Sequence, residues 1–238
     1  MHLLRLAFKR QTAMAVIALI LASGVSLGLV AARILWTGRW QYAFLPWNLF
    51  LAWLPLAFAL MACDAFQSGT SRNWRFWGYA SAWLLFFPNA PYIFTDIIHL
   101  TARGFGHFWI DLVLVLLCAM TGLVLGFVSL FLMQSVVRRR LGQAASWMFI
   151  AIVAGLSGFG IYLGRFLRFN SWDVIFRPFA LTRGVGQWVS DPLGHPGSVA
   201  FPVLFATFLF LAYVMLYALT HLQQAQPIAL GSAHHQGA

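Results

Sequence analysis

The sequence predicts an all-α, polytopic membrane protein with about six transmembrane helices. Hydrophobic residues make up 61% of the 238-residue chain and charged residues only 8%, whereas a soluble domain carries about 25% charged residues. The apolar residues also gather in long runs, and a transmembrane helix needs about 20 of them in succession. Six such runs can be recognised, at about 12–32, 42–62, 74–94, 108–133, 147–163 and 199–220.

The first two runs are long enough to cross a bilayer. The first is free of charge and follows Arg5, Lys9 and Arg10. A signal peptide begins in the same way, but this apolar stretch exceeds the usual length of about 7 to 15 residues. We therefore expect it to remain as the first transmembrane helix. The second run includes Asn48 and two prolines.

The third run is interrupted. Its uninterrupted part, Trp74 to Phe87, has 14 residues, or about 21 Å of helix, against a hydrocarbon core of about 30 Å. Pro88 and Pro91 follow, and each disfavours helical geometry in the residue before it. Broken backbone within a membrane is tolerated only where protein buries it or where it lines a wet cavity. The sequence therefore predicts a broken third helix beside a polar site.

The remaining runs complete a single domain. The fourth has Asp111 near its start, and a link of 35 residues separates the fifth from the sixth. Because most connections in helical bundles are far shorter, we expect this link to carry structure of its own. The transmembrane domain then covers residues 1–220. The polar tail 221–238 has the composition of a disordered segment.

The alternation of loops between the two sides of the membrane, which we call parity, places the unusual polar residues on one side. Whatever the orientation, the loops after the first, third and fifth spans emerge on the same face. If the N-terminus is cytoplasmic, eight basic residues lie on that side and seven on the other, so the count decides nothing. The short basic loop Arg138–Arg140 and the basic N-terminus are typical of cytoplasmic segments, which favours both termini inside.

The segment FFPNAPYIFTDIIHL, residues 86–100, is the first candidate site. Asn89 is suited to cap a helix that restarts at Pro91. Residues three and four apart share one face of such a helix, which would carry Tyr92, Asp96, His99 and Arg103. Asp96 and His99 could act as a general acid/base pair, or as two metal ligands with Asp111 as a third. The alternative is an interfacial helix whose polar stripe faces water.

The segment GRFLRFNSWD, residues 164–173, is the second candidate. It brings four candidate ligand-binding residues to the end of the fifth span: Arg165, Arg168, Asn170 and Asp173. The aspartates 96, 111 and 173 could neutralise the arginines 103, 165 and 168, since a desolvated carboxylate needs a partner to stay ionised. One arginine could instead remain available for a phosphate or a carboxylate. Both interpretations stay open.

Several classes of protein are excluded. The formal charge of +10 comes from basic residues that are dispersed between apolar runs, rather than clustered on one face as in nucleic-acid binders. Cys63 and Cys118 lie in or beside apolar runs without metal or disulfide spacing, so we expect two core thiols. No motif for a cofactor or a metal is recognised.

Three ordered motifs carry a resemblance. NLFLAWLPL at 48–56, FFPNAPYIFTDIIHL at 86–100 and YLGRFLRFNSWD at 162–173 resemble an uncharacterised family of bacterial integral membrane proteins, catalogued only as a domain of unknown function. The resemblance extends from about Ala43 to Leu219. It implies a multi-span protein of the bacterial inner (plasma) membrane and no particular activity.

The sequence thus supports three hypotheses. The first is a polar outer-face site that binds, and could process, an anionic or lipid-linked ligand, with Arg165 and Arg168 holding the anion and with Asp96 and His99 handling a proton. The second is a non-catalytic accessory subunit with membrane-protein partners. The third is a transporter, because broken helices often form binding sites. The expected surroundings are the lipid bilayer.

Overall fold

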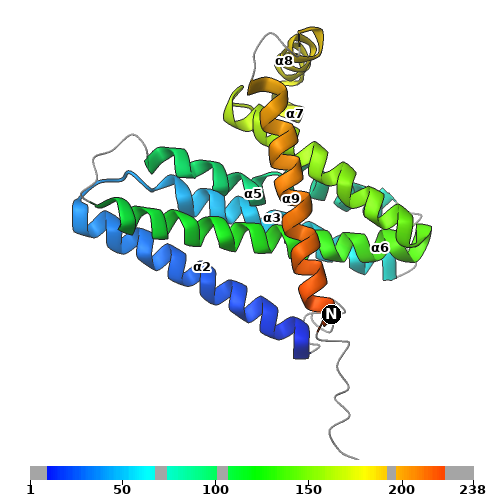
Figure 1. Ribbon diagram of the computed structural model, residues 1–238, viewed down its shortest axis with the longest axis horizontal. Coiled ribbons are helices and arrows are strands. Elements are labelled where there is room, and N and C mark those ends of the chain that lie inside the picture. Colours follow the sequence, from blue (N-terminus) through cyan, green and yellow to red (C-terminus); the bar gives the residue numbers. More distant parts are fainter. Residues whose placement is uncertain (1–9, 68–73, 101–106, 192–196, 223–238) are drawn as a thin grey trace, which may run out of the picture.

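The computed structural model describes residues 10–67, 74–100, 107–191 and 197–222. All elements within these ranges are helices, and the described residues contain no strand, which confirms the predicted all-α class. In chain order (Figure 1) they are α2 Arg10–Thr37, α3 Phe44–Gln67, α4 Trp74–Phe86, α5 Asn89–Tyr92, the 3₁₀ helix η2 Ile93–Leu100, α6 Phe108–Arg165, α7 Asp173–Phe176, α8 Pro178–Ser190 and α9 Gly197–Leu222. Arg103 and the predicted tail from residue 223 onward lie outside the described residues.

Helix α6 is two antiparallel segments joined at Gly142. That glycine has φ +88° and ψ 177°, a left-handed conformation that L side chains rarely adopt. The chain reverses there (Figure 1). Trp83 of α4 touches both segments: its indole nitrogen donates to Ser129 Oγ at 3.1 Å, and its ring stacks on Phe149 at 5.8 Å. The two segments correspond to the predicted runs 108–133 and 147–163.

Within the described part of the chain, four helices are long and apolar enough to cross a membrane, which supports the prediction of a polytopic membrane protein. They are Val16–Thr37, Phe44–Gln67, Phe108–Arg165 and Gly197–Thr220. Helix α4 has only 13 residues, because the prolines end it early. The count of six spans therefore stays a prediction.

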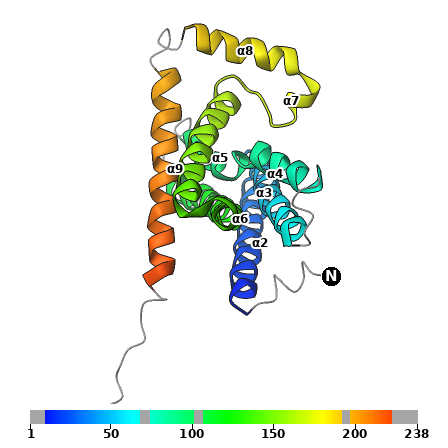
Figure 2. The ribbon, with the colours of Figure 1, turned by 90° about the vertical axis from the view of Figure 1, so that its right-hand side faces the viewer.

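The bundle packs around α3 and α6, with α9 crossing it. Small side chains on α3, such as Ala52, Ala59 and Ala62, are fully buried and allow close helix contact, as is usual within membranes. Helix α9 does not run parallel to α2 and α3 but crosses α6 (Figures 1 and 2). A Cβ added at Gly158 would lie 2.3 Å from the Pro202 carbonyl oxygen, so only glycine permits this crossing.

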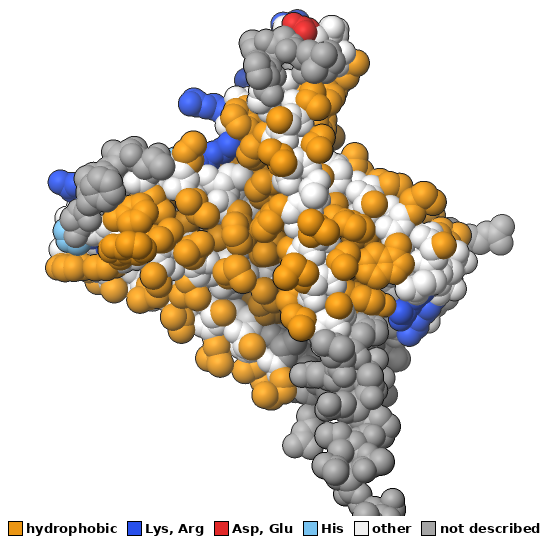
Figure 3. Space-filling view, in the orientation of Figure 1, with side chains coloured by type: hydrophobic (Ala, Val, Ile, Leu, Met, Phe, Trp, Pro, Cys, Tyr) orange, Lys and Arg blue, Asp and Glu red, His pale blue; other side chains and the backbone are white. Residues whose placement is uncertain are grey.

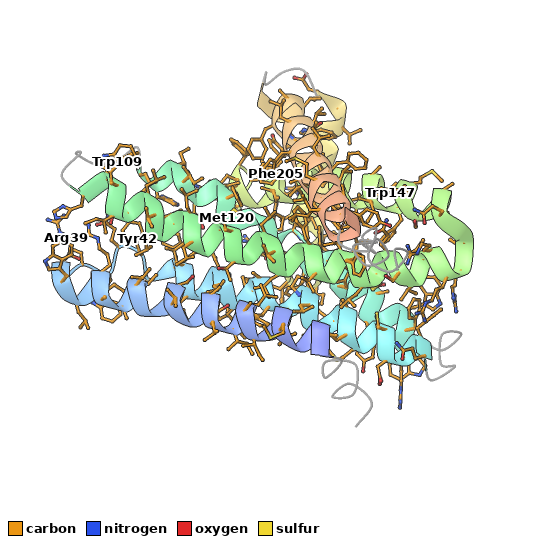
Figure 4. All side chains as sticks on the ribbon, turned by 60° about the horizontal axis from the view of Figure 1, so that its bottom comes forward. Arg39, Tyr42, Trp109, Met120, Trp147 and Phe205 are labelled. Carbon is orange, nitrogen blue, oxygen red and sulfur yellow. The ribbon has the colours of Figure 1, made fainter. Side chains whose placement is uncertain are left out.

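The outer surface has the distribution of a membrane protein. On the face in Figure 3, hydrophobic side chains cover the middle of the bundle, and the few basic side chains lie toward its ends and near α7 and α8. Arg39 and Trp109 lie together at one end, whereas Trp147 lies toward the other (Figure 4). Trp109 is 74% exposed, as expected of an aromatic anchor at the interface.

The predicted break of the third run is present. Helix α4 ends at Phe86, and α5 and η2 continue the chain in a new geometry. The restart is mainly a 3₁₀ helix rather than the predicted α-helix. Asn89 is not its cap: Pro88 occupies the N-cap position, and the Asn89 amide donates to Ser171 Oγ at 3.0 Å. A Cβ at Gly160 would lie 3.0 Å from Pro88 Cγ, so this glycine lets α6 approach the break.

The link before the last span carries structure, as predicted. It forms α7 and α8, which lie beyond the bundle at one end of α9 (Figures 1 and 2). No residue of α8 is buried. Its partly covered residues are Leu181, Gly184, Val185 and Trp188. Their spacing of three and four places them on one helix face, and this face is turned toward the bundle.

Candidate functional site

Three side-chain contacts join the ends of elements that are far apart in sequence. Arg33 at the end of α2 binds Asp111 in the first turn of α6. Asn48 in the second turn of α3 donates to Asp96 of η2, and Arg165 at the end of α6 binds the same carboxylate. These contacts agree with the predicted parity, which brings the connections after the first, third and fifth runs to one side.

Asp96 is the centre of the polar cluster. Asp96 is 1% exposed, and both of its carboxylate oxygens accept hydrogen bonds. Asn48 Nδ2 donates to Oδ2 at 2.8 Å, and Arg165 Nη1 donates to Oδ1 at 3.2 Å. Burial raises the pKa of Asp96 to about 6, against the lowering effects of Asn48 and Arg165. The carboxylate is therefore mostly ionised at neutral pH but close to its titration.

Arg165 and His99 form the part of the cluster nearest to solvent. Arg165 Nη2 donates to the Thr95 carbonyl at 2.9 Å and lies 3.4 Å from His99 Nε2. Its guanidinium also lies over the Tyr92 ring, 5.9 Å from the centroid. The His99 side chain is 46% exposed, with Nε2 3.8 Å from Asp96 Oδ1. Its ring packs against Phe44 at 5.1 Å. Among these groups, His99 is the best placed to meet a ligand.

The loop after α6 borders this cluster. The Asn170 backbone N–H donates to Asp173 Oδ2 at 2.7 Å, so this aspartate is used to fix the loop. Ser171 receives the hydrogen bond from Asn89, which ties the loop to the helix break. Arg168 is exposed and has φ 57°, a conformation that is uncommon for a residue other than glycine. Such outliers recur at functional sites.

The predicted charge pairing is wrong in part. Asp111 does not join the other candidates but accepts from Arg33 Nε at 2.6 Å and from Nη2 at 3.2 Å. Asp173 accepts a hydrogen bond from a backbone N–H, and Asp96 pairs with Arg165, one of the predicted arginines that the structure describes. Arg33 was not among the expected partners, because the first predicted run ends at residue 32, whereas α2 extends to Thr37 and includes Arg33.

A cleft of about 740 Å³ adjoins the cluster. It lies between α3, the α4–α5–η2 segment and the second half of α6, with α7 and α8 contributing to its border. The candidates Asn89, Tyr92, Asp96, His99, Arg165 and Asn170 line it, together with Asn48. Its apolar walls include Leu51, Leu84, Leu85, Leu156 and Leu163. The candidates Arg168, Asp111 and Asp173 do not line it.

The described residues do not assemble a metal centre. No three histidine, cysteine or aspartate side chains among them come together as a possible metal site. Asp111, considered as a third ligand beside Asp96 and His99, is held by Arg33 instead. The cluster offers hydrogen-bond donors around a carboxylate that is already paired. Such donors are suited to holding a polar group.

Two partners of the candidate aspartates were not predicted from the sequence. Asn48 lies in the second run and in the NLFLAWLPL motif, and it donates to Asp96 at the site. Arg33 follows the first predicted run and pairs with Asp111, away from the cleft. A polar side chain in an apolar transmembrane helix is energetically costly, and this cost marks such a residue as a functional candidate by default. That signal was present in the sequence for both residues.

Comparisons with known proteins identify a family without giving an activity. A family model described as a protein of unknown function (DUF1361) matches residues 47–215. The search of curated proteins found no match, and the search of solved structures found none either.

Proposed function

The chain belongs to the DUF1361 family of proteins of unknown function, and we propose that it is a membrane protein that binds a ligand with an anionic head group in the cleft beside Asp96. The observation that carries this proposal is the composition of the cleft. A paired aspartate, an arginine, a histidine and three asparagines line the same space as several leucines. Pockets that bind small molecules combine such apolar walls with a few convergent polar groups.

In this proposal each polar residue has a distinct role. Asp96 positions Arg165 and does not itself meet the ligand, because both of its oxygens are occupied. Arg165 supplies positive charge at the cleft, and His99 donates to the ligand or accepts a proton from it. Arg168 is an additional exposed cation near the border. Charge-assisted hydrogen bonds of this kind are stronger than neutral ones.

The proposal includes an orientation. The exposed Arg138–Arg140 loop lies at the end opposite the cleft, since Arg140 stands over the rings of Phe66 and Phe76. A short, strongly basic loop is typical of the cytoplasmic side. The cleft then opens to the outer side of a bacterial inner membrane, with both termini in the cytoplasm.

A direct experiment uses dihexanoylphosphatidic acid, a water-soluble lipid with an anionic head group. Isothermal titration of the purified protein in detergent should show saturable binding, and His99→Ala should weaken it. Ser135→Ala is a matched control, because Ser135 does not line the cleft and, among the described residues, its hydroxyl donates to the Phe131 carbonyl of its own helix. Absence of binding to the wild type would contradict the proposal.

One observation favours a second candidate, a non-catalytic accessory subunit. Asp96 and Asp111 are each satisfied by an arginine of the same chain, which is also what a purely structural role requires. In that case, exchanging Asp96 and Arg165 in a double variant should preserve the cellular function. Under the ligand-binding proposal the exchange should abolish it, because an aspartate would replace the cation that Arg165 supplies to the ligand at the cleft.

A further inference from the structure

A second groove lies under α8, beside the cleft. It has a volume of about 360 Å³ and is formed by α6, α8 and α9. Its lining consists of apolar residues and one glycine: Gly155, Leu156, Phe159, Val185, Trp188, Val189, Val199, Pro202, Val203 and Ala206. A space with such walls offers nothing to a polar molecule and suits hydrocarbon.

The groove adjoins the cleft along one helix. Leu156 and Phe159 of α6 line both spaces. Helix α8 borders both as well, with Leu181 at the cleft and Trp188 at the groove. Trp188 packs on Phe159 with a centroid distance of 4.8 Å, and its indole nitrogen donates to the Ser198 carbonyl at 3.1 Å. The apolar face of α8 therefore borders two neighbouring spaces, one with polar residues and one apolar.

From this adjacency of a polar cleft and an apolar groove we infer that the ligand is a membrane lipid, with its head group in the cleft beside His99 and Arg165 and one hydrocarbon chain in the α6–α8–α9 groove. This inference rests on the proposed function and names its ligand class. Leu156 and Val203 are 48% and 56% exposed, so the groove opens on the side of the bundle, where lipid surrounds a membrane protein. The lipid would reach the cleft from within the bilayer.

The walls of the groove suit a hydrocarbon chain rather than a protein segment. All of its lining side chains are apolar, apart from the glycine, which has none, so they offer packing contacts and few hydrogen bonds. A hydrocarbon chain requires no hydrogen-bond partners from the walls, whereas a protein segment carries backbone N–H and C=O groups that need them.

Gly155 offers a way to fill the groove without disturbing the bundle. A Cβ added at Gly155 meets no atom within 4 Å, and leucine is a better helix former than glycine. Gly155→Leu should therefore fold and occupy the space of the chain. Val203→Phe fills the same groove from α9. Gly28→Leu on α2 is the matched control, since a Cβ there also meets nothing within 4 Å and Gly28 lines neither space.

The experiment compares dioleoylphosphatidic acid with its dihexanoyl analogue by native mass spectrometry and titration. Gly155→Leu and Val203→Phe should each weaken dioleoyl binding about tenfold, the loss of a modest number of packing contacts. They should leave dihexanoyl binding unchanged, as should Gly28→Leu for both lipids. If both groove variants bind the dioleoyl lipid like the wild type, the inference is wrong although the cleft proposal stands. If the wild type binds neither lipid, both fail.

Discussion

Two buried carboxylates in the same half of the bundle, Asp96 and Asp111, are held by arginines in different ways. Asp111 and Arg33 form a two-point contact between α2 and α6, with distances of 2.6 and 3.2 Å. Asp96 shares its two oxygens between Arg165 and Asn48, on a 3₁₀ segment that borders a cleft. The ion pair between Arg33 and Asp111 links two long helices. The Asp96 contacts leave an arginine and a histidine at the edge of a space that a ligand can fill.

The comparison teaches that a buried charge is not by itself a sign of function. Both aspartates are equally unusual in an apolar chain, and both have an arginine partner. What separates them is the surroundings. Asp96 lies near a helix break and lines a cleft with several other polar side chains, whereas Asp111 joins two continuous helices, and the space beside Arg33 is otherwise lined by apolar side chains. The following predictions test this separation, from the largest expected effect to the smallest.

Removing Arg33 should have the largest effect on stability. Arg33→Ala leaves the buried Asp111 carboxylate without its charged partner, which costs about 3 to 5 kcal/mol in typical cases. Thermal unfolding in detergent measures this loss. The double variant Arg33→Met, Asp111→Leu should recover most of the stability, because apolar replacements of a buried pair are often neutral. A double variant as unstable as the single one would show that the pair does more than link the two helices.

Asp96→Ala should destabilise the protein less, by about 2 kcal/mol. Arg165 would keep the Thr95 carbonyl and the Tyr92 ring as neighbours, so its positive charge would retain favourable contacts. Binding of dihexanoylphosphatidic acid should nevertheless be lost, because Arg165 and His99 lose the group that positions them. Titration of a folded Asp96→Ala variant tests this point, and unchanged binding would remove Asp96 from the site.

Stability should also depend on pH through Asp96. Its pKa in the folded protein, about 6, lies above the ordinary value of 3.8. The folded state therefore binds this proton more tightly, and the stabilisation is complete below about pH 4 and is lost as the pH rises through 6. Melting temperatures should fall by a few degrees across this window. In Asp96→Asn this component should disappear, and its persistence would assign the titration to another group.

His99→Ala should have the smallest effect on stability and a clear effect on binding. The side chain is 46% exposed, so the free energy of unfolding should change by less than about 0.5 kcal/mol. Loss of a hydrogen bond to a charged head group should weaken dihexanoylphosphatidic acid binding about tenfold. His99→Gln, which keeps a donor, should recover part of the affinity. Equal binding by wild type and His99→Ala would place the ligand elsewhere.

The sequence predicted the fold class, the break at Pro88–Pro91 and the meeting of distant polar segments. These follow from strong local rules: apolar runs of bilayer length, proline stereochemistry and the alternation of loops across a membrane. Parity alone indicated that residues near Asp96 and Arg165 share a side.

Other features could not be predicted because they depend on helix rotation and tilt. The spacing of residues in one run does not reveal which face of α2 meets α6, so Arg33 was not expected as the partner of Asp111. Nor did it indicate that Asn89 would donate to Ser171 rather than cap a helix, since both roles suit a short amide side chain. The groove under α8 arises from the crossing of α9, which no local pattern encodes.

The most direct test of the separation is a titration of dihexanoylphosphatidic acid into three proteins side by side: the wild type, the Arg33→Met, Asp111→Leu double variant and His99→Ala. We predict equal binding by the first two and binding about tenfold weaker by His99→Ala. The opposite pattern, with binding lost in the double variant and kept in His99→Ala, would contradict the assignment of Asp96 to the site and of Asp111 to the scaffold.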